Sequence, residues 1–135
     1  MRNEDLKYIK CDHFNLQEFA NSMAGNRVKC DLDLLWKLNE LRKIVGVITV
    51  TSGYRTPAFN ATCGGSDNSY HLEGKAADIL FDFKGWTKTS LTKVLQYLGF
   101  TNVNFYWDGE RLDRLHVDIG KTWNGKEFNY RDLKA

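Results

Sequence analysis

The segment SYHLEGKAADILFDF, residues 69–83, joins the end of a loop to a buried strand. Its second part, Ala76 to Phe83, is predicted to be a strand because small and apolar residues dominate it. Its first part carries His71, and Gly74 lies between that histidine and Asp78. Because glycine adopts backbone conformations that other residues avoid, the chain can bend at Gly74 and bring His71 and Asp78 together. The segment therefore predicts a polar site where the loop meets the strand.

A long loop precedes the predicted strand. Hydrophobic periodicity disappears between Ser52 and Glu73, and four of the 11 glycines lie from Gly53 to Gly74. Loops of this length inside compact domains are usually functional, although an ordered surface loop is the simpler alternative. We therefore expect the loop to form one wall of the polar site.

The flanking sequence contains further helices and strands. Apolar residues recur every three to four positions in two segments, and β-branched or aromatic residues dominate three others. The order of these elements predicts an α+β domain with a largely antiparallel sheet and helices packed on one face. The expected elements are helices at 31–45 and 87–98, a helix start within 14–19, strands at 47–51, 76–83, 103–107 and 115–119, and a hairpin turn at 108–111.

Composition restricts the function classes. The 135 residues suffice for one compact domain, 1–135, and 19 basic against 17 acidic residues give a net charge of +2. This balance argues against a nucleic-acid partner. No apolar stretch is long enough to span a bilayer, and the charged N-terminus does not resemble a signal peptide. We therefore expect a protein made in the cytoplasm, without a membrane partner, that acts as a monomer.

Two histidines and an aspartate have the pattern of a catalytic metal site. Catalytic zinc takes three protein ligands, and imidazole nitrogen and carboxylate oxygen both suit it. His71 and Asp78 would supply a close pair, and His116 a third ligand from a distant segment. The alternative is that each histidine is a structural or surface residue, as we expect for His13. The pattern is compatible with a zinc site between the sheet and the long loop, and spacing alone leaves both interpretations open.

A catalytic zinc also requires a base, and two carboxylates are near His116. Asp118 lies two residues after His116, so a strand would place both on one face, where Asp118 could orient the histidine. Asp113 lies three residues before His116 and has the wrong parity for a continuous strand. It reaches the site only if the strand begins after it or bulges there. Parity alone does not choose between the two.

Three motifs resemble the zinc D-alanyl-D-alanine carboxypeptidase family, which includes D,D-dipeptidases and phage L-alanyl-D-glutamate endopeptidase endolysins. They are Ser-Gly-Tyr-Arg at 52–55, Ser-x-His-x6-Asp at 69–78 and His-Val-Asp at 116–118. Their order and spacing are unlike chance matches. The resemblance covers residues 47–119 and implies that this core carries the motifs of a single zinc peptidase domain.

The resemblance implies a role for each matching residue. His71, Asp78 and His116 would be the zinc ligands, and Asp113 would be the general base and acid. Arg55 would bind the scissile carbonyl or its oxyanion, for which a permanently charged guanidinium is suited. Ser69 would hydrogen-bond the substrate near the metal.

The resemblance also implies a zinc metallopeptidase that hydrolyses peptidoglycan stem peptides. We expect a D,D-carboxypeptidase or endopeptidase, and favour a cell-wall hydrolase of the phage endolysin kind, released to the wall from the cytoplasm. One alternative is an intracellular D-Ala-D-Ala dipeptidase. A second is a non-catalytic zinc-containing binding module of the same fold, against which Asp113 and Arg55 argue.

Overall fold

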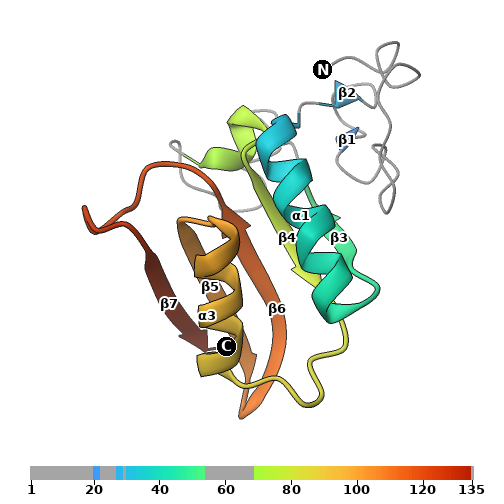
Figure 1. Cartoon of the computed structure of the whole chain (residues 1–135), viewed down its shortest axis with the longest axis vertical. Coiled ribbons are helices and arrows are strands. Elements are labelled where there is room, and N and C mark those ends of the chain that lie inside the picture. The colour runs from blue at the N-terminus through green and yellow to red at the C-terminus, as the bar shows by residue number, and fades with distance from the viewer. Residues whose placement is uncertain (1–19, 22–26, 29, 54–68, 135) are drawn as a thin grey trace.

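The computed structural model describes residues 20–21, 27–28, 30–53 and 69–134. These residues form a five-stranded sheet, two α-helices that cover one of its faces, and a separate two-stranded sheet (Figure 1). The elements are β1 (Ala20–Asn21), β2 (Arg27–Val28), α1 (Leu32–Val45), β3 (Thr49–Ser52), the 3-10 helix η4 (Tyr70–Glu73), β4 (Ala76–Leu80), α3 (Lys88–Leu98), β5 (Asn102–Asp108), β6 (Arg111–Asp118) and β7 (Asn129–Lys134).

The main sheet has the strand order β3-β4-β6-β5-β7. Its first four strands pair in antiparallel fashion, and only β7 runs parallel to its neighbour, β5. The expected α+β class with a largely antiparallel sheet is thus confirmed. The hairpin at 108–111 is also confirmed, because Asp108 pairs with Arg111 across a two-residue turn in which Gly109 has a φ of 62°.

The sequence-based expectation was wrong at some boundaries and missed three strands. β3 begins at Thr49 rather than at residue 47, β4 ends at Leu80 rather than at 83, and β6 begins at Arg111 rather than at 115. Strands β1, β2 and β7 were not predicted. β7 is an edge strand whose residues after Asn129 are all exposed, so it lacks the apolar alternation that marks a half-buried strand. The expected helix start at 14–19 lies outside the described residues.

Both α-helices begin at side-chain caps. Asp31 accepts a hydrogen bond from the backbone N–H of Asp33 at the start of α1, and Thr87 forms a reciprocal capping box with Ser90 at the start of α3. Both helices bury leucines against the sheet, namely Leu34, Leu35, Leu38, Leu41, Leu91 and Leu95. The helices at 31–45 and 87–98 are therefore confirmed within one residue.

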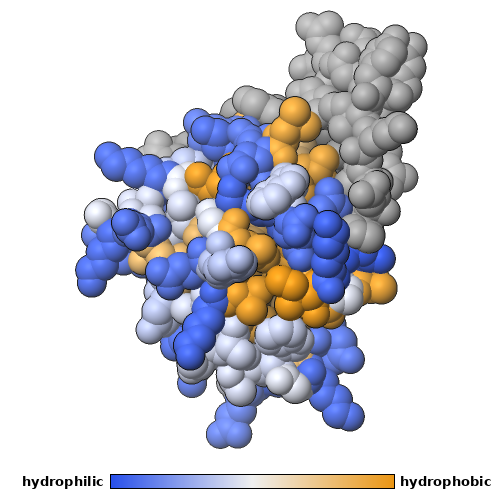
Figure 2. All heavy atoms as spheres, in the orientation of Figure 1, coloured by the Kyte–Doolittle hydropathy of each residue, from blue (hydrophilic) through white to orange (hydrophobic). Residues whose placement is uncertain are grey.

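The core determines which face of the sheet remains for the site. Leu115 and Val117 on β6 are fully buried and belong to the same apolar cluster as the helix leucines. Because strand residues alternate between faces, His116 and Asp118 point to the opposite face. Figure 2 shows the helix-bearing face, where hydrophilic side chains surround apolar ones. None of the described helices is both long and apolar enough to cross a membrane.

Candidate metal centre

A tight turn connects the two residues that the sequence placed on either side of Gly74. His71 lies in η4, which ends at Gly74 in the left-handed conformation with φ 68° and ψ 21°. The N–H of Gly74 donates to the carbonyl of His71, and the chain then enters β4, where Asp78 is the third residue. The predicted bend at Gly74 is confirmed.

The third residue of the cluster comes from the neighbouring strand. His116 on β6 is the direct cross-strand partner of Asp78 on β4, so both side chains project from the same face of the sheet. Oδ1 of Asp78 lies 3.2 Å from Nε2 of His71 and 3.1 Å from Nδ1 of His116. All three residues are buried, and one potential ligand atom from each lies within 4.8 Å of the others. The structure therefore brings together the three predicted ligands.

Hydrogen bonds on the far side of each imidazole orient the rings. Nδ1 of His71 donates to the carbonyl of Gly53 at 2.7 Å, and Nε2 of His116 donates to Oδ2 of Asp118 at 2.7 Å. A carbonyl and a carboxylate act here as acceptors, so the far nitrogens, Nδ1 of His71 and Nε2 of His116, carry the hydrogen. When the rings are neutral, the other nitrogens, which face Asp78, can each present a lone pair. Metal-binding histidines are typically oriented by such partners. The expectation that Asp118 shares a face with His116 is confirmed, and the hydrogen bond between them is the contact that an orienting role requires.

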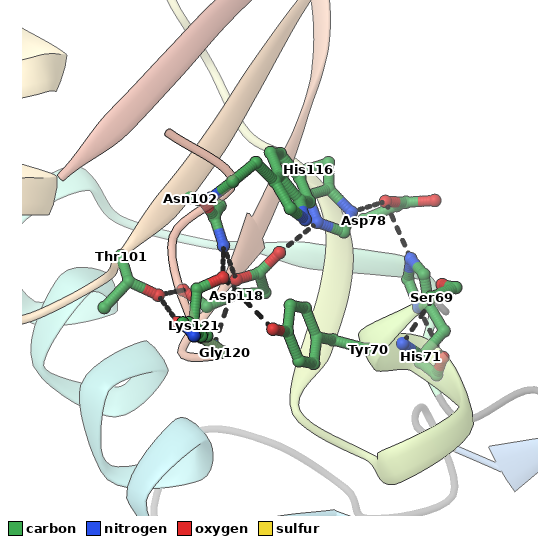
Figure 3. A network of polar contacts seen from close by, with 12 residues as sticks. Ser69, Tyr70, His71, Asp78, Thr101, Asn102, His116, Asp118, Gly120 and Lys121 are labelled. Carbon is green, nitrogen blue, oxygen red and sulfur yellow. Dashed lines mark hydrogen bonds and ion pairs between the residues drawn. The ribbon is translucent and has the colours of Figure 1, made fainter. Parts of the chain in front are cut away.

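Asp118 is itself held by a buried network (Figure 3). Its Oδ1 accepts hydrogen bonds from Nδ2 of Asn102 at 2.8 Å and from the N–H of Gly120 at 3.1 Å. The side chain has no solvent exposure. Because both carboxylate oxygens are engaged, Asp118 is committed to holding His116 and is poorly placed to act as a base.

Charge couples the aspartates and histidines in the metal-free cluster. Burial opposes ionisation of Asp78, but hydrogen bonds from His116 and His71 outweigh burial and hold the pKa of Asp78 well below its usual range. Burial also opposes the charged form of His116, yet its hydrogen bonds to Asp118 and Asp78 raise its pKa to about 9. In the metal-free cluster, the Asp78 carboxylate is thus ionised and the proton on His116 balances its charge. A bound cation can take the place of that proton.

The donor set fits a metal ion that accepts nitrogen and oxygen together. Two imidazole nitrogens and one carboxylate oxygen converge at a buried point, and the two far nitrogens are already bonded. Zinc takes this combination in sites that leave a position open for chemistry. The residues therefore fit the expected ion.

Comparison with known proteins agrees with this arrangement. The family model for peptidase M15 matches residues 12–118, which include all three residues of the cluster. The chain belongs to the peptidase M15 family. It is also 27% identical over 134 residues to the zinc D-Ala-D-Ala carboxypeptidase of Streptomyces albus G. The alignment covers 92% of this chain and 52% of that protein, so the chain spans about half the length of this relative.

Within this M15 fold, Asp113 lies at a β-bulge. Tyr106 on β5 pairs with Arg114 and the next residue, Trp107, pairs with Leu112, which leaves Asp113 as the extra residue on β6. The strand begins before Asp113, so of the two routes that parity left open, the bulge is the one observed. The bulge lets Leu112 pack against the core while the Asp113 side chain remains 54% exposed. Asp113 is thus released from the core-facing position that regular alternation would give it.

The remaining predicted site residues are placed as follows. Ser69 precedes η4, and its hydroxyl oxygen accepts a hydrogen bond from the N–H of His71 at 3.3 Å, which caps the 3-10 helix. Arg55 lies outside the described residues, as does His13. The substrate contact expected of Ser69 remains a prediction, and the structure adds a local structural role for that residue.

Three participants in the M15 centre were not identified from the sequence. Gly53 acts through its carbonyl, which leaves no side-chain signal. Asn102 supports the site by donating a hydrogen bond to Asp118. Trp123 supports it through its ring, which stacks on the ring of His116 with centroids 5.9 Å apart. A signal for Asn102 exists, because Asn102-Val103-Asn104-Phe105 alternates polar with apolar residues and so indicates a polar face.

Proposed function

We propose that this chain is a zinc-dependent metallopeptidase that hydrolyses peptide bonds in peptidoglycan stem peptides. The observation that carries the proposal is the convergence of His71, Asp78 and His116, with both far imidazole nitrogens already bonded. This arrangement leaves three ligand atoms directed at one point. The three residues would hold the zinc ion.

Bound zinc would supply a Lewis acid that polarises the scissile carbonyl and promotes ionisation of water. The protein must then supply a base for the attacking water and an acid for the leaving amine. We assign both tasks to Asp113, whose carboxylate is exposed and lies at the β6 bulge on the strand that carries His116. Asp118 is a poor candidate for this role, because it is buried and its carboxylate already accepts hydrogen bonds from Nε2 of His116, Nδ2 of Asn102 and the N–H of Gly120.

Two further residues complete the proposal. Arg55 would stabilise the negative charge that develops on the carbonyl oxygen, because a guanidinium offers fixed donors and a permanent charge. Ser69 would hydrogen-bond the substrate beside the metal ligands, since it directly precedes the helix that carries His71.

The substrate class rests on the relative. The Streptomyces albus G protein is named as acting on D-Ala-D-Ala, the end of a peptidoglycan stem peptide. We extend that substrate class to this chain and propose a cell-wall hydrolase, of either the carboxypeptidase or the endolysin-like endopeptidase type. We expect a monomer that acts without a nucleic-acid or membrane partner.

The test compares two substrates with and without metal. Zinc-loaded protein is incubated with purified peptidoglycan and with D-Ala-D-Ala, with or without a chelator, and mass spectrometry identifies the products. We expect chelator-sensitive release of a peptide or amino acid, with the mass of the product naming the bond. His116→Ala should abolish release and lose the metal. Zinc binding without hydrolysis of either substrate would instead favour the binding-module alternative.

A further inference from the structure

A row of side chains crosses the sheet from the metal centre to its far edge. Asp78 pairs with His116, His116 pairs with Asn104 on β5, and Asn104 pairs with Arg131 on β7. Cross-strand partners share a face of the sheet, so Asn104 and Arg131 lie on the face of the metal cluster. With neighbouring strands about 4.8 Å apart, the backbones of His116 and Arg131 are separated by roughly 10 Å.

Trp123 connects the two ends of this row. Its ring stacks on the ring of His116 with centroids 5.9 Å apart and planes 29° apart. The guanidinium carbon of Arg131 lies 4.6 Å from the centroid of the same indole. The backbone N–H of Trp123 donates to Oδ1 of Asn102, which fixes the segment against the Asp118 network. The guanidinium is therefore held on the site face by an aromatic ring that also contacts a predicted metal ligand.

The polar edge of this guanidinium is available to a ligand. Stacking uses the flat face of an arginine and leaves its N–H donors at the edge. Among the described residues, no carboxylate lies within 4.0 Å of Arg131, whereas Arg111 at the hairpin tip has Asp108 and Asp113 as partners. The neighbouring Asn104 is 9% exposed, and its Oδ1 has no hydrogen-bond donor among the described residues. Among the described residues, the row thus contains a guanidinium without an ion-pair partner and an amide oxygen without a hydrogen-bond donor.

We propose that Arg131, held by Trp123, binds a carboxylate of the peptide substrate. This inference rests on the proposed peptidase function and adds the anionic group that the substrate must carry. The separation of roughly 10 Å from His116 corresponds to about three extended residues, so the carboxylate lies within a few residues of the scissile bond. Two carboxylates of a stem peptide satisfy this requirement, namely the C-terminal carboxylate and that of the D-glutamyl residue.

Three synthetic peptides distinguish these sources. The first is L-Ala-γ-D-Glu-L-Lys-D-Ala-D-Ala, the second carries a C-terminal carboxamide, and the third has D-isoglutamine in place of D-glutamate. Hydrolysis is measured for the wild type, Arg131→Gln, Arg131→Lys and the control Arg114→Gln. Arg114 is a matched control because it lies on the same face of the sheet, two residues before His116 on β6. Its guanidinium carbon also lies over an aromatic ring, 4.3 Å from the centroid of Tyr106.

For the first peptide we expect Arg131→Gln to raise KM about tenfold, the effect of losing one charge-assisted pair, with kcat changed less than about twofold. Arg131→Lys should recover part of this loss, since it keeps the charge without the fork. The KM difference between wild type and Arg131→Gln should vanish for the peptide that lacks the bound carboxylate. An equal KM increase in Arg114→Gln, or the same difference with all three peptides, would overturn the proposal.

Peptide binding separates failure of this inference from failure of the proposed function. Calorimetry in the presence of a chelator measures the Kd of each peptide without hydrolysis, and thermal unfolding verifies that the variants fold. If the wild type cleaves no peptide, yet binds the carboxylate peptide about tenfold more tightly than Arg131→Gln does, the peptidase proposal fails and the Arg131 assignment stands. Equal Kd values for the two proteins would refute the assignment whatever the activity.

Discussion

Asp118 and His116 lie two residues apart on β6, and Oδ2 of Asp118 accepts a hydrogen bond of 2.7 Å from Nε2 of His116. This bond directs the other ring nitrogen, Nδ1, at Asp78. The carbonyl of Gly53 does the same for His71. The centre is therefore arranged by a shell of acceptors around the imidazoles as well as by the three ligand candidates themselves.

Asp118→Asn should weaken metal binding while the fold persists. The amide nearly preserves the shape of the carboxylate, but it removes the negative charge that holds the Nε2 proton of His116. We expect the Kd for zinc to rise by roughly ten- to a hundredfold, measured by competition with a chromophoric chelator. The control is Asp108→Asn, a substitution of an exposed aspartate at the hairpin tip. Equal zinc affinity in wild type and Asp118→Asn would refute an orienting role.

Zinc binding should depend on pH through His116. Its raised pKa of about 9 contributes stability to the metal-free protein that is fully present below about pH 6.5 and is lost as the pH rises through 9. The metal must displace this proton, so the affinity for zinc should increase by about tenfold per pH unit between about pH 6.5 and pH 9. Calorimetry in buffers of different ionisation enthalpy should show about one proton released per zinc at pH 7. A pH-independent affinity over this range would contradict the assignment.

Asp113→Asn should separate metal binding from catalysis. Asp113 is more than half exposed, and the hydrogen bonds that join His71, Asp78 and His116 do not involve it. We therefore expect unchanged zinc content and thermal stability, with hydrolysis reduced by about 10²- to 10⁴-fold, the usual contribution of a general base. Wild-type rates in Asp113→Asn would exclude this residue as the base. Loss of zinc together with unfolding would instead indicate a structural role.

Gly120→Ala should disturb the centre through Tyr70. A Cβ atom at Gly120 would lie 2.2 Å from the Tyr70 ring, whose hydroxyl donates to the carbonyl of Lys121. The ring must move, and Tyr70 is the residue before His71 in η4. We expect the free energy of unfolding to fall by about 1–3 kcal/mol, the usual cost of overpacking, together with weaker zinc binding.

A double mutant tests the cause of that loss. If the clash with the Tyr70 ring is responsible, Gly120→Ala combined with Tyr70→Ala should cost less than the sum of the two single substitutions. Chemical denaturation of the four proteins measures this coupling. Strict additivity would show that Gly120 matters for a reason other than the ring.

Much of the site could be predicted from the sequence because its chemistry resides in side chains at fixed spacing. His71, Asp78 and His116 are recognisable as a ligand pattern, and strand parity alone places Asp118 beside His116. The helix at 31–45 was predictable because its leucines recur at helical spacing and aspartates lie at its start.

The rest depends on contacts that local sequence does not encode. The bulge at Asp113 arises from the register between β5 and β6, and the parity of one strand offers two solutions without choosing between them. The carbonyl of Gly53 has no side chain to signal its role. The Arg131 row requires that β7 pair in parallel with β5, yet the exposed residues of β7 carry no apolar pattern that predicts a strand.

We propose above all that His71, Asp78 and His116 hold a catalytic zinc ion. A crystal structure of the zinc-loaded protein, with anomalous data collected at the zinc edge, tests it most directly. We predict a single strong peak about 2.0–2.2 Å from Nε2 of His71, Nδ1 of His116 and a carboxylate oxygen of Asp78. A peak at other residues, or one bonded through Nδ1 of His71 or Nε2 of His116, would refute this ligand set.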